Sequence, residues 1–299
     1  MKNKVLGITI STITALSATM IVLSVIAIMA EIVIGGWSTM TWEFLTAAPK
    51  GGMTEGGIFP AIIGTFLLVI IMSMVGVPIG TITAIYLSEY ASSMSKLART
   101  IRFAVNTLAG VPAIVFGLFG LGFFVQFVGS GIDNVTNGGV KLQWGQPNIL
   151  WASLTMALLT LPVVIVSVEE AIKNVPRELR EASLALGATK LQTIVKIVLP
   201  NSITGILTGG ILAVSRGAGE VAPILFTGAA YFLPHLPNAL SDQFMELGYH
   251  IYIMSTQSPD VEATRGIQYA TTLVLLLLTF LLNFSAIFLR YKLRTRAFR

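Results

Sequence analysis

The fold is decided by a polar segment that reads EEAIKNVPRELREASLALGATKLQTIVKIVLPN over residues 169–201. Pro176 suits the first turn of a helix, because a backbone N–H at that position has no partner within the helix. Glu178 and Glu181 lie near that turn, where the helix dipole favours acidic side chains, and Gly187 fits the position just past a helix end. The segment therefore predicts a short amphipathic helix, a structure suited to docking in a groove of another protein.

Strongly apolar sequence surrounds this segment on both sides. Of the 299 residues, 54% are hydrophobic and only 11% are charged, and the mean hydropathy is +0.81. A soluble domain carries about a quarter charged residues. Apolar runs of about twenty residues, long enough to cross about 30 Å of hydrocarbon, cover residues 5–34, 58–87, 108–128, 148–168, 203–226 and 267–289. We therefore predict an all-α membrane protein with six transmembrane helices.

The composition also excludes several classes of function. The net charge of +5 comes from scarce acids rather than from a basic surface, which argues against nucleic-acid binding. The chain has no cysteine, and His235 and His250 are too far apart in the outer loop to suggest a metal centre. The sequence contains no Gly-x-x-x-x-Gly-Lys-Ser/Thr loop and no grouped nucleophile and base. We therefore expect a chain that binds no cofactor or metal and is not an enzyme.

The distribution of Lys and Arg predicts the orientation in the membrane. With both termini in the cytoplasm, fifteen of the 19 basic residues lie in cytoplasmic segments, three in outer loops and one inside the fifth span. Positive loops stay on the cytoplasmic side, so the bias predicts a multi-pass protein of the cell membrane. Its predicted parts are a first span with its outer loop (1–57), a core (58–290) that includes the cytoplasmic loop 169–201, and a basic cytoplasmic tail (291–299).

The cytoplasmic loop resembles that of a known family. Glu181-Ala182-Ser183 is followed after three residues by Gly187, and after nine more by Ile-Val-Leu-Pro at 197–200. This spacing is similar to the EAA loop of ABC importer permeases, E-A-A-x3-G-x9-I-x-L-P, from which Ser183 departs in place of the second alanine. The resemblance implies that the loop forms a coupling helix, which sits in a cleft of a cytoplasmic ATPase and transmits its closure to the membrane helices.

Three further segments are similar to the phosphate-importer permeases of the PstA type. They are LAGVPAIVFGLFG at 108–120, SRGAGEVAP at 215–223, and VPIG at 77–80 leading to AIYLSEY at 84–90. The usual forms are A-G-V-P-S-I-V-F-G and R-x-x-G-E-T-A-P, so Ala113 replaces a serine and Val221 a threonine. The resemblance covers about residues 58–290, and it implies the type I ABC importer fold, which is MetI-like.

The same resemblance implies a set of partners. They are a second, homologous permease that forms a heterodimer with this chain, two cytoplasmic ATP-binding subunits and an extracytoplasmic phosphate-binding protein. This chain, embedded in the lipid bilayer, forms half of the translocation path, and ATP is used by the partner ATPase. Two alternatives stay open: a permease for another oxyanion such as sulfate, molybdate or phosphonate, and a secondary transporter driven by an ion gradient. The second requires inverted repeats, which the sequence does not display.

The fifth span carries two charges that are expensive inside a membrane. Arg216 lies near the middle of the predicted span, and Glu220 follows four residues later on the same predicted helical face. The two form either a structural ion pair or part of an anion path. If phosphate is the substrate, Arg216 offers it a guanidinium fork and Glu220 accepts its remaining proton, which sulfate lacks at neutral pH.

Prolines within the spans and charged residues near the span ends lead to further expectations. Pro78, Pro112 and Pro162 interrupt three spans, and they indicate either ordinary packing with nearby glycines or broken helices that line a path. Glu89, at the inner end of the second span, is explained by hydration at the membrane surface, and Arg180 is expected to pair with acids of the loop or of the ATPase.

Overall fold

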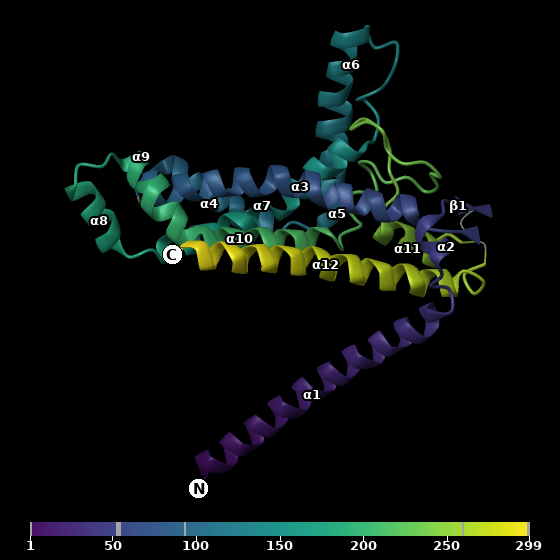
Figure 1. Ribbon diagram of the computed structural model, residues 1–299, viewed down its shortest axis with the longest axis horizontal. Coiled ribbons are helices and arrows are strands. Elements are labelled where there is room, and N and C mark those ends of the chain that lie inside the picture. Colours follow the sequence, from purple (N-terminus) through teal and green to yellow (C-terminus); the bar gives the residue numbers. More distant parts are fainter. Residues whose placement is uncertain (1, 52–54, 93, 259, 298–299) are drawn as a thin grey trace.

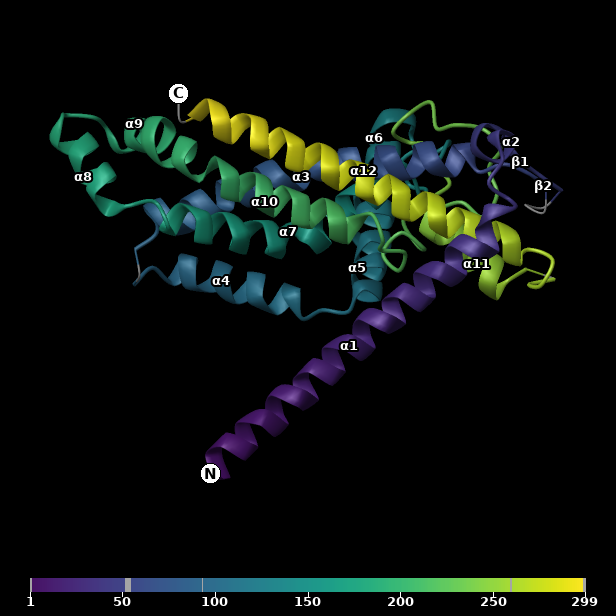
Figure 2. The same cartoon turned by 60° about the horizontal axis from the view of Figure 1, so that its bottom comes forward.

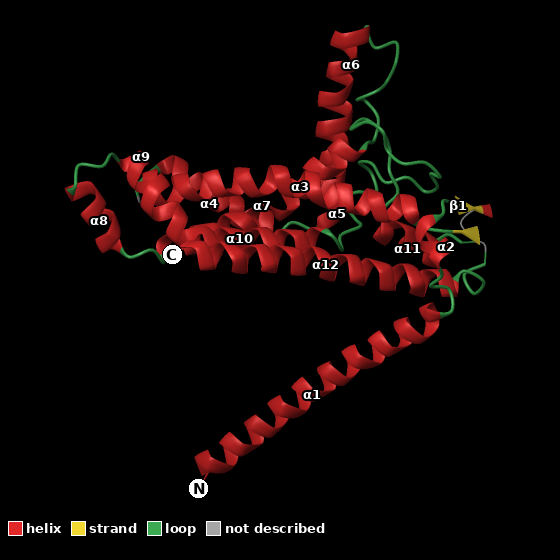
Figure 3. Ribbon diagram, viewed as in Figure 1, coloured by secondary structure: helices red, strands yellow, loops and turns green. Residues whose placement is uncertain are grey.

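The computed structural model describes residues 2–51, 55–92, 94–258 and 260–297, and they form a long helical bundle (Figures 1 and 3). Residues 52–54 of the predicted first outer loop and 298–299 of the predicted tail lie outside this described part. Its helices and strands are α1 (Lys2–Trp37), α2 (Trp42–Thr46), β1 (Pro49–Lys50), β2 (Glu55–Gly56), α3 (Phe59–Ile85), α4 (Lys96–Ala109), α5 (Ala113–Phe119), α6 (Ser130–Asn137), α7 (Ile149–Lys173), α8 (Arg177–Ala185), α9 (Lys190–Thr193), α10 (Leu199–Gly217), α11 (Leu247–Thr256) and α12 (Arg265–Ala297). Three π-helical turns extend them, namely η2 (Tyr86–Tyr90), η3 (Gly120–Gly129) and η4 (Ile194–Val198).

Six stretches of the described chain are long and apolar enough to cross a membrane, as predicted. They are Leu6–Trp37, Phe59–Tyr90, Ala113–Asn137, Ile149–Lys173, Lys190–Gly217 and Arg265–Lys292. Both chain ends point towards the end of the bundle that carries α8, whereas β1, α2 and α11 gather at the opposite end (Figure 1). The six-span prediction is therefore confirmed, and α12 continues into the segment predicted as a tail.

The centre of the bundle is α7, which packs against α3 on one side and α10 on another. Since lipid tails are as apolar as the side chains, packing rather than exclusion of water holds such helices together. Small residues allow the close approach: Gly76 of α3 faces Ala157 of α7, and a Cβ on Gly80 would lie 2.6 Å from Cγ1 of Val164. Pro78 and Pro162 lie within continuous helices, so at these two positions the packing interpretation is the correct one.

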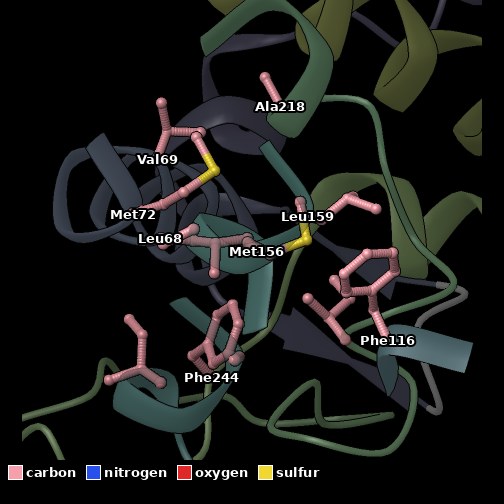
Figure 4. Close-up of a cluster of buried hydrophobic side chains, with 12 residues drawn as sticks. Leu68, Val69, Met72, Phe116, Met156, Leu159, Ala218 and Phe244 are labelled. Atoms are coloured by element: carbon pink, nitrogen blue, oxygen red, sulfur yellow. The ribbon is translucent and has the colours of Figure 1, made fainter. Parts of the chain in front are cut away.

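Buried side chains from α3, α5, α7 and the segment after α10 meet in one core cluster (Figure 4). Leu68 and Met72 of α3 pack there with Met156 of α7 and with Phe244 from the outer segment. Truncating such a residue to alanine typically costs about 2–5 kcal/mol, because the surrounding structure relaxes only partly into the cavity. The cluster fixes the positions of the helix ends that approach it.

Two predicted spans are wrong in their extent, because their helices break inside the bundle. The chain predicted as one helix from residue 108 instead ends α4 at Ala109 and begins α5 at Ala113. Pro112 causes this break, since proline cannot donate a backbone hydrogen bond and moves the preceding residue out of the helical region. Likewise the fifth helix does not reach residue 226: α10 ends at Gly217, and turns follow it.

Two long helices diverge from the bundle. Residues 113–137 form one continuous helix of α5, η3 and α6 that crosses the bundle steeply, so that α6 projects beyond it (Figures 1 and 2). Among the described helices, α1 packs mainly against α12, where a Cβ on Gly35 would clash with Tyr269, and the hydroxyl of Tyr269 donates a hydrogen bond of 2.9 Å to Glu31. Most of α1 is therefore exposed in the isolated chain.

A buried carboxylate at the outer end of the bundle links α11 to α3 through hydrogen bonds. Glu246 precedes α11, and its carboxylate accepts hydrogen bonds from the N–H of Tyr249 (2.6 Å) and the hydroxyl of Thr65 (3.4 Å). His250, one turn further on, is also buried, and it lies in the helix α11 rather than in an irregular outer loop. Burial raises the pKa of Glu246 to about 7, despite these hydrogen bonds, and lowers the pKa of His250 to about 4.

Glu246 gives the protein a pH-dependent stability. Its pKa is about 7 when folded and 4.5 in the unfolded chain, so the folded state binds more protons between these values. The contribution of Glu246 to stability is therefore greatest below pH 4.5 and falls by about 3 kcal/mol as the pH rises to 7. We expect Glu246→Gln to raise the melting temperature in detergent at pH 8 more than at pH 5. An equal effect at both pH values would show that burial does not disfavour the charge.

Candidate functional site

The predicted amphipathic helix is present as α8, at the end of the bundle (Figure 1). Pro176 precedes its first residue, as predicted, and Gly187 follows its end with φ +85°, a backbone conformation that glycine adopts without strain. The N–H of Gly187 donates to the carbonyl of Leu184 at 2.9 Å. None of the α8 residues is buried, so the helix offers most of its surface to another molecule.

Replacing Gly187 by alanine is expected to weaken the end of α8. A left-handed conformation costs an L-residue about 1 kcal/mol more than glycine, although a Cβ would find open space at this position. Hydrogen exchange in the last turn of α8 should therefore become about fivefold faster. Exchange unchanged in Gly187→Ala would show that the turn does not depend on glycine.

Ser183, which replaces the second alanine of the E-A-A pattern, makes a contact that explains the difference. Its hydroxyl lies 2.9 Å from the hydroxyl of Thr193, at the end of α9, so this hydrogen bond joins the two short helices of the loop. Thr189 and Gln192 cap the start of α9 reciprocally, which orders the turn after Gly187. Glu181 and Ala182 remain exposed, on the part of α8 that an incoming partner can reach.

Ion pairs that the sequence did not predict join the bundle at this end. Glu169 of α7 pairs with Arg102 of α4 and, at 2.8 Å, with Lys173 one turn along its own helix. Glu89 in η2 pairs with Arg180 of α8 at 3.1 Å, so hydration alone does not explain this acid. The partners in the Arg102–Glu169 and Glu89–Arg180 pairs are 67 and 91 residues apart in sequence, separations at which no local pattern indicates a contact.

The two charges of the fifth span lie at the broken end of α10. Arg216 is in the last turn of this helix and Glu220 lies three residues beyond it, with 3.7 Å between Arg216 Nε and Glu220 Oε1. The side chains remain 41% and 28% exposed, and the distance exceeds that of a hydrogen bond. This is a loose, accessible ion pair, which leaves the guanidinium able to bind an anion.

The depth of Arg216 follows from its neighbours on α12. The hydroxyl of Ser215 donates to Asn283 at 2.7 Å, and Arg290, seven residues further along α12, donates to Thr208 at 3.1 Å. Seven residues of helix span about 10 Å, so Arg216 lies well inside the bundle from its α8 end. A helix that ends at this depth leaves polar backbone groups unpaired, which membrane proteins tolerate only within protein or beside water.

The structure brings two of the three PstA-like segments, 108–120 and 215–223, together at this depth. Gly117 of α5 faces the carbonyl oxygens of Ala222 and Pro223, each 3.0 Å from where a Cβ would stand. Phe116 and Ala218 belong to one core cluster, and Ala113 packs against it (Figure 4). The start of α5, where the helix dipole is positive, and the end of α10 are therefore held on one cluster with Arg216 beside it.

Comparison with known proteins shows the family to which the chain is similar. The family model of the binding-protein-dependent transport system inner membrane component matches residues 76–298. A Bacillus subtilis protein described as probable ABC transporter permease protein YqgI is 32% identical over 83% of this chain and 83% of its own length. The Mycobacterium leprae phosphate transport system permease protein PstA is 37% identical over 64% of this chain and 58% of its own length.

Solved structures agree on the fold. A chain of a bacterial ABC transporter involved in alginate import superposes with a TM-score of 0.63 at 16% identity, covering 93% of this chain and 95% of that one. A chain of the MetNI methionine ABC transporter gives 0.52 at 18% identity, with coverages of 79% and 94%. The predicted type I, MetI-like fold is confirmed. Six spans, an exposed loop helix and the family match lead to one conclusion: the chain belongs to the inner membrane components of binding-protein-dependent transport systems.

Proposed function

We propose that this chain is the permease subunit of an ATP-driven importer for inorganic phosphate. The observation that carries the proposal is the contact between the PstA-like segments 108–120 and 215–223, the second of which carries the loose pair of Arg216 and Glu220. The M. leprae relative, named as a phosphate transport permease, supports the same substrate. The alternative of an ion-driven secondary transporter is not favoured, because the family consists of components that work with binding proteins.

The chemistry of phosphate suits the pair. Near neutral pH, phosphate carries between one and two negative charges and at least one proton, so a guanidinium can bind its oxygens while a carboxylate accepts its hydrogen. Arg216 and Glu220 supply these two groups at a separation that an oxyanion can bridge. Exposure of both side chains keeps binding weak enough for release, which a transport path requires.

Coupling runs through the cytoplasmic end. ATP binding closes a pair of ATP-binding subunits, and the closure moves α8, whose exposed face includes Glu181 and Ala182. A second, homologous permease forms the other half of the path, and a phosphate-binding protein delivers the anion from outside. Both termini and α8 then lie in the cytoplasm, in accordance with the positive-inside rule. The path opens alternately to each side as the two permeases move.

The substrate is tested with the complete complex in proteoliposomes. We expect ATP-dependent uptake of phosphate, with sulfate and molybdate competing poorly. Exchanging Glu220 for glutamine removes the proton acceptor and the repulsion of a fully ionised anion, so discrimination against sulfate should fall. Equal uptake of sulfate and phosphate by the wild-type complex would instead support a general oxyanion importer.

A further inference from the structure

Arg180 is the residue of α8 that connects this helix to the bundle. The other residues of α8 are exposed, except Ser183, which bonds to α9, but the Arg180 side chain is only 18% exposed. No buried apolar residue of α8 holds it against α3 or α7. Polar contacts of a single side chain therefore decide how firmly α8 is attached to α3 and α7.

The guanidinium of Arg180 reaches three separate groups. Its Nε and Nη2 lie 3.2 and 3.1 Å from Oε1 of Glu89, whose own side chain is 11% exposed. Its Nη1 donates to the carbonyl of Val175 at 2.5 Å, and Nη2 also donates to the carbonyl of Ile172 at 2.7 Å. These carbonyls lie at the end of α7, where a helix leaves acceptors unpaired, so the cation caps α7 while it pairs with η2.

We propose that Arg180 is the positioning residue that makes α8 move as one body with α3 and α7. The proposal rests on the proposed function, in which an ATPase moves α8. Only residues 174–176 connect α7 to α8 covalently, so without Arg180 this turn absorbs part of the displacement and less of it reaches α3 and α7. The planar fork of arginine contacts all three groups at once, which a lysine ammonium cannot do.

The other ion pairs of this end do not have this role. Glu169 joins α4 to α7 through Arg102, and Lys173 belongs to α7 itself, so neither contact includes α8. Ser183 joins α8 to α9, which leads directly into α10. Arg180 is thus the side chain, within the described residues, through which α8 reaches α3 and α7.

The first test is the amount of anion imported per ATP hydrolysed by the reconstituted complex. We expect Arg180→Ala to lower this ratio about tenfold while ATP hydrolysis continues within about twofold of wild type, a range typical of mutations that alter coupling between sites. Arg180→Lys should be intermediate. Lys196→Ala, which removes another positive charge from the same loop at an exposed position, should leave the ratio unchanged. An unchanged ratio in Arg180→Ala would overturn the proposal.

Further variants test the proposal if Arg180→Ala fails to assemble into the complex. Glu89→Ala removes the partner from outside α8 and leaves the surface of α8 intact, so it should lower the ratio in the same direction. The chain has no cysteine, which allows Glu89→Cys with Arg180→Cys to be joined by a short bifunctional thiol reagent. Joining should restore the ratio, whereas a monofunctional reagent should not. Loss of import on joining would show that α8 must hinge, against the proposal.

A measurement independent of the substrate separates this proposal from the proposed function. Spin labels on exposed positions of α8 and α3 report the distance distribution between the two helices. The distribution should be narrow in the wild type and broad in Arg180→Ala, whichever anion is carried. If the wild-type complex does not import phosphate, the proposed substrate fails while this result still decides the role of Arg180. An equally narrow distribution in both proteins would overturn that role.

Discussion

Phosphate uptake is expected to be lost when Arg216 is replaced by alanine, although the complex still assembles and binds ATP. The loose pair with Glu220 contributes little to the fold, because its charges are 3.7 Å apart and partly exposed. A hydrogen bond from a charged group to an anion is worth about 1.5–3 kcal/mol, so uptake should fall by about ten- to a hundredfold. The measurement is labelled phosphate uptake by proteoliposomes at matched amounts of assembled complex.

A lysine at the same position distinguishes charge from geometry. Arg216→Lys keeps a positive charge but loses the planar fork, so uptake should recover only in part. Normal uptake by Arg216→Ala would make the pair structural and would move the anion path to other residues or to the partner subunit. If Arg216→Ala reduces both uptake and assembly, the lysine variant decides whether Arg216 binds the anion or only supports the structure.

The second large effect is expected where the broken helices meet. A side chain at position 117 would press on the carbonyl oxygens of Ala222 and Pro223, which are backbone atoms and cannot rotate away. Overpacking of this kind costs about 1–3 kcal/mol. We therefore expect Gly117→Val to displace the turn that carries Glu220 and to lower phosphate uptake about tenfold or more, with Gly117→Ala between it and wild type.

Gly122 provides the matched control on the same continuous helix. A Cβ at this position meets nothing within 4 Å in this chain, so Gly122→Val adds the same volume without a clash. Thermal unfolding and uptake of the two valine variants should differ, with only Gly117→Val impaired in both. If Gly117→Val transports normally, the contact between the two segments is not part of the path.

Hydropathy along the sequence predicted the number of membrane spans. Six apolar runs became six spans, because length and composition alone decide whether a segment can cross a membrane. The helix α8 was predicted from Pro176, two acids and Gly187, since helix caps depend on neighbours within one turn. These features need no knowledge of distant residues.

The positions at which helices end inside the predicted spans, and the ion pairs between residues distant in sequence, could not be predicted in this way. The apolar sequence continues through Ala218 and Pro223, so hydropathy extends the fifth span although α10 has already ended at Gly217. Of the three prolines in the predicted spans, Pro112 breaks a helix, whereas Pro78 and Pro162 lie inside continuous helices, so proline alone did not show where a span breaks. The contact between Glu89 and Arg180 depends on how α8 folds back, which residue type and spacing do not encode.

Charged side chains lie at two separate levels of the bundle. Arg216 lies inside the bundle, whereas the pairs at the α8 end lie around the moving helix. In the proposed mechanism the first group handles the anion and the second set transmits force. Separating the two functions lets the ATPase act at a distance from the site at which phosphate binds.

The claim that this chain is a subunit of an ATP-driven phosphate importer is tested most directly by measuring which energy source drives uptake. Proteoliposomes that contain this chain, its permease partner, the ATP-binding subunits and the binding protein are loaded with ATP or left without it, and phosphate uptake is measured with and without ionophores that collapse ion gradients. We predict uptake only with ATP and the ATP-binding subunits, and no effect of the ionophores. Uptake by this chain alone that stops when the gradients collapse would contradict the account.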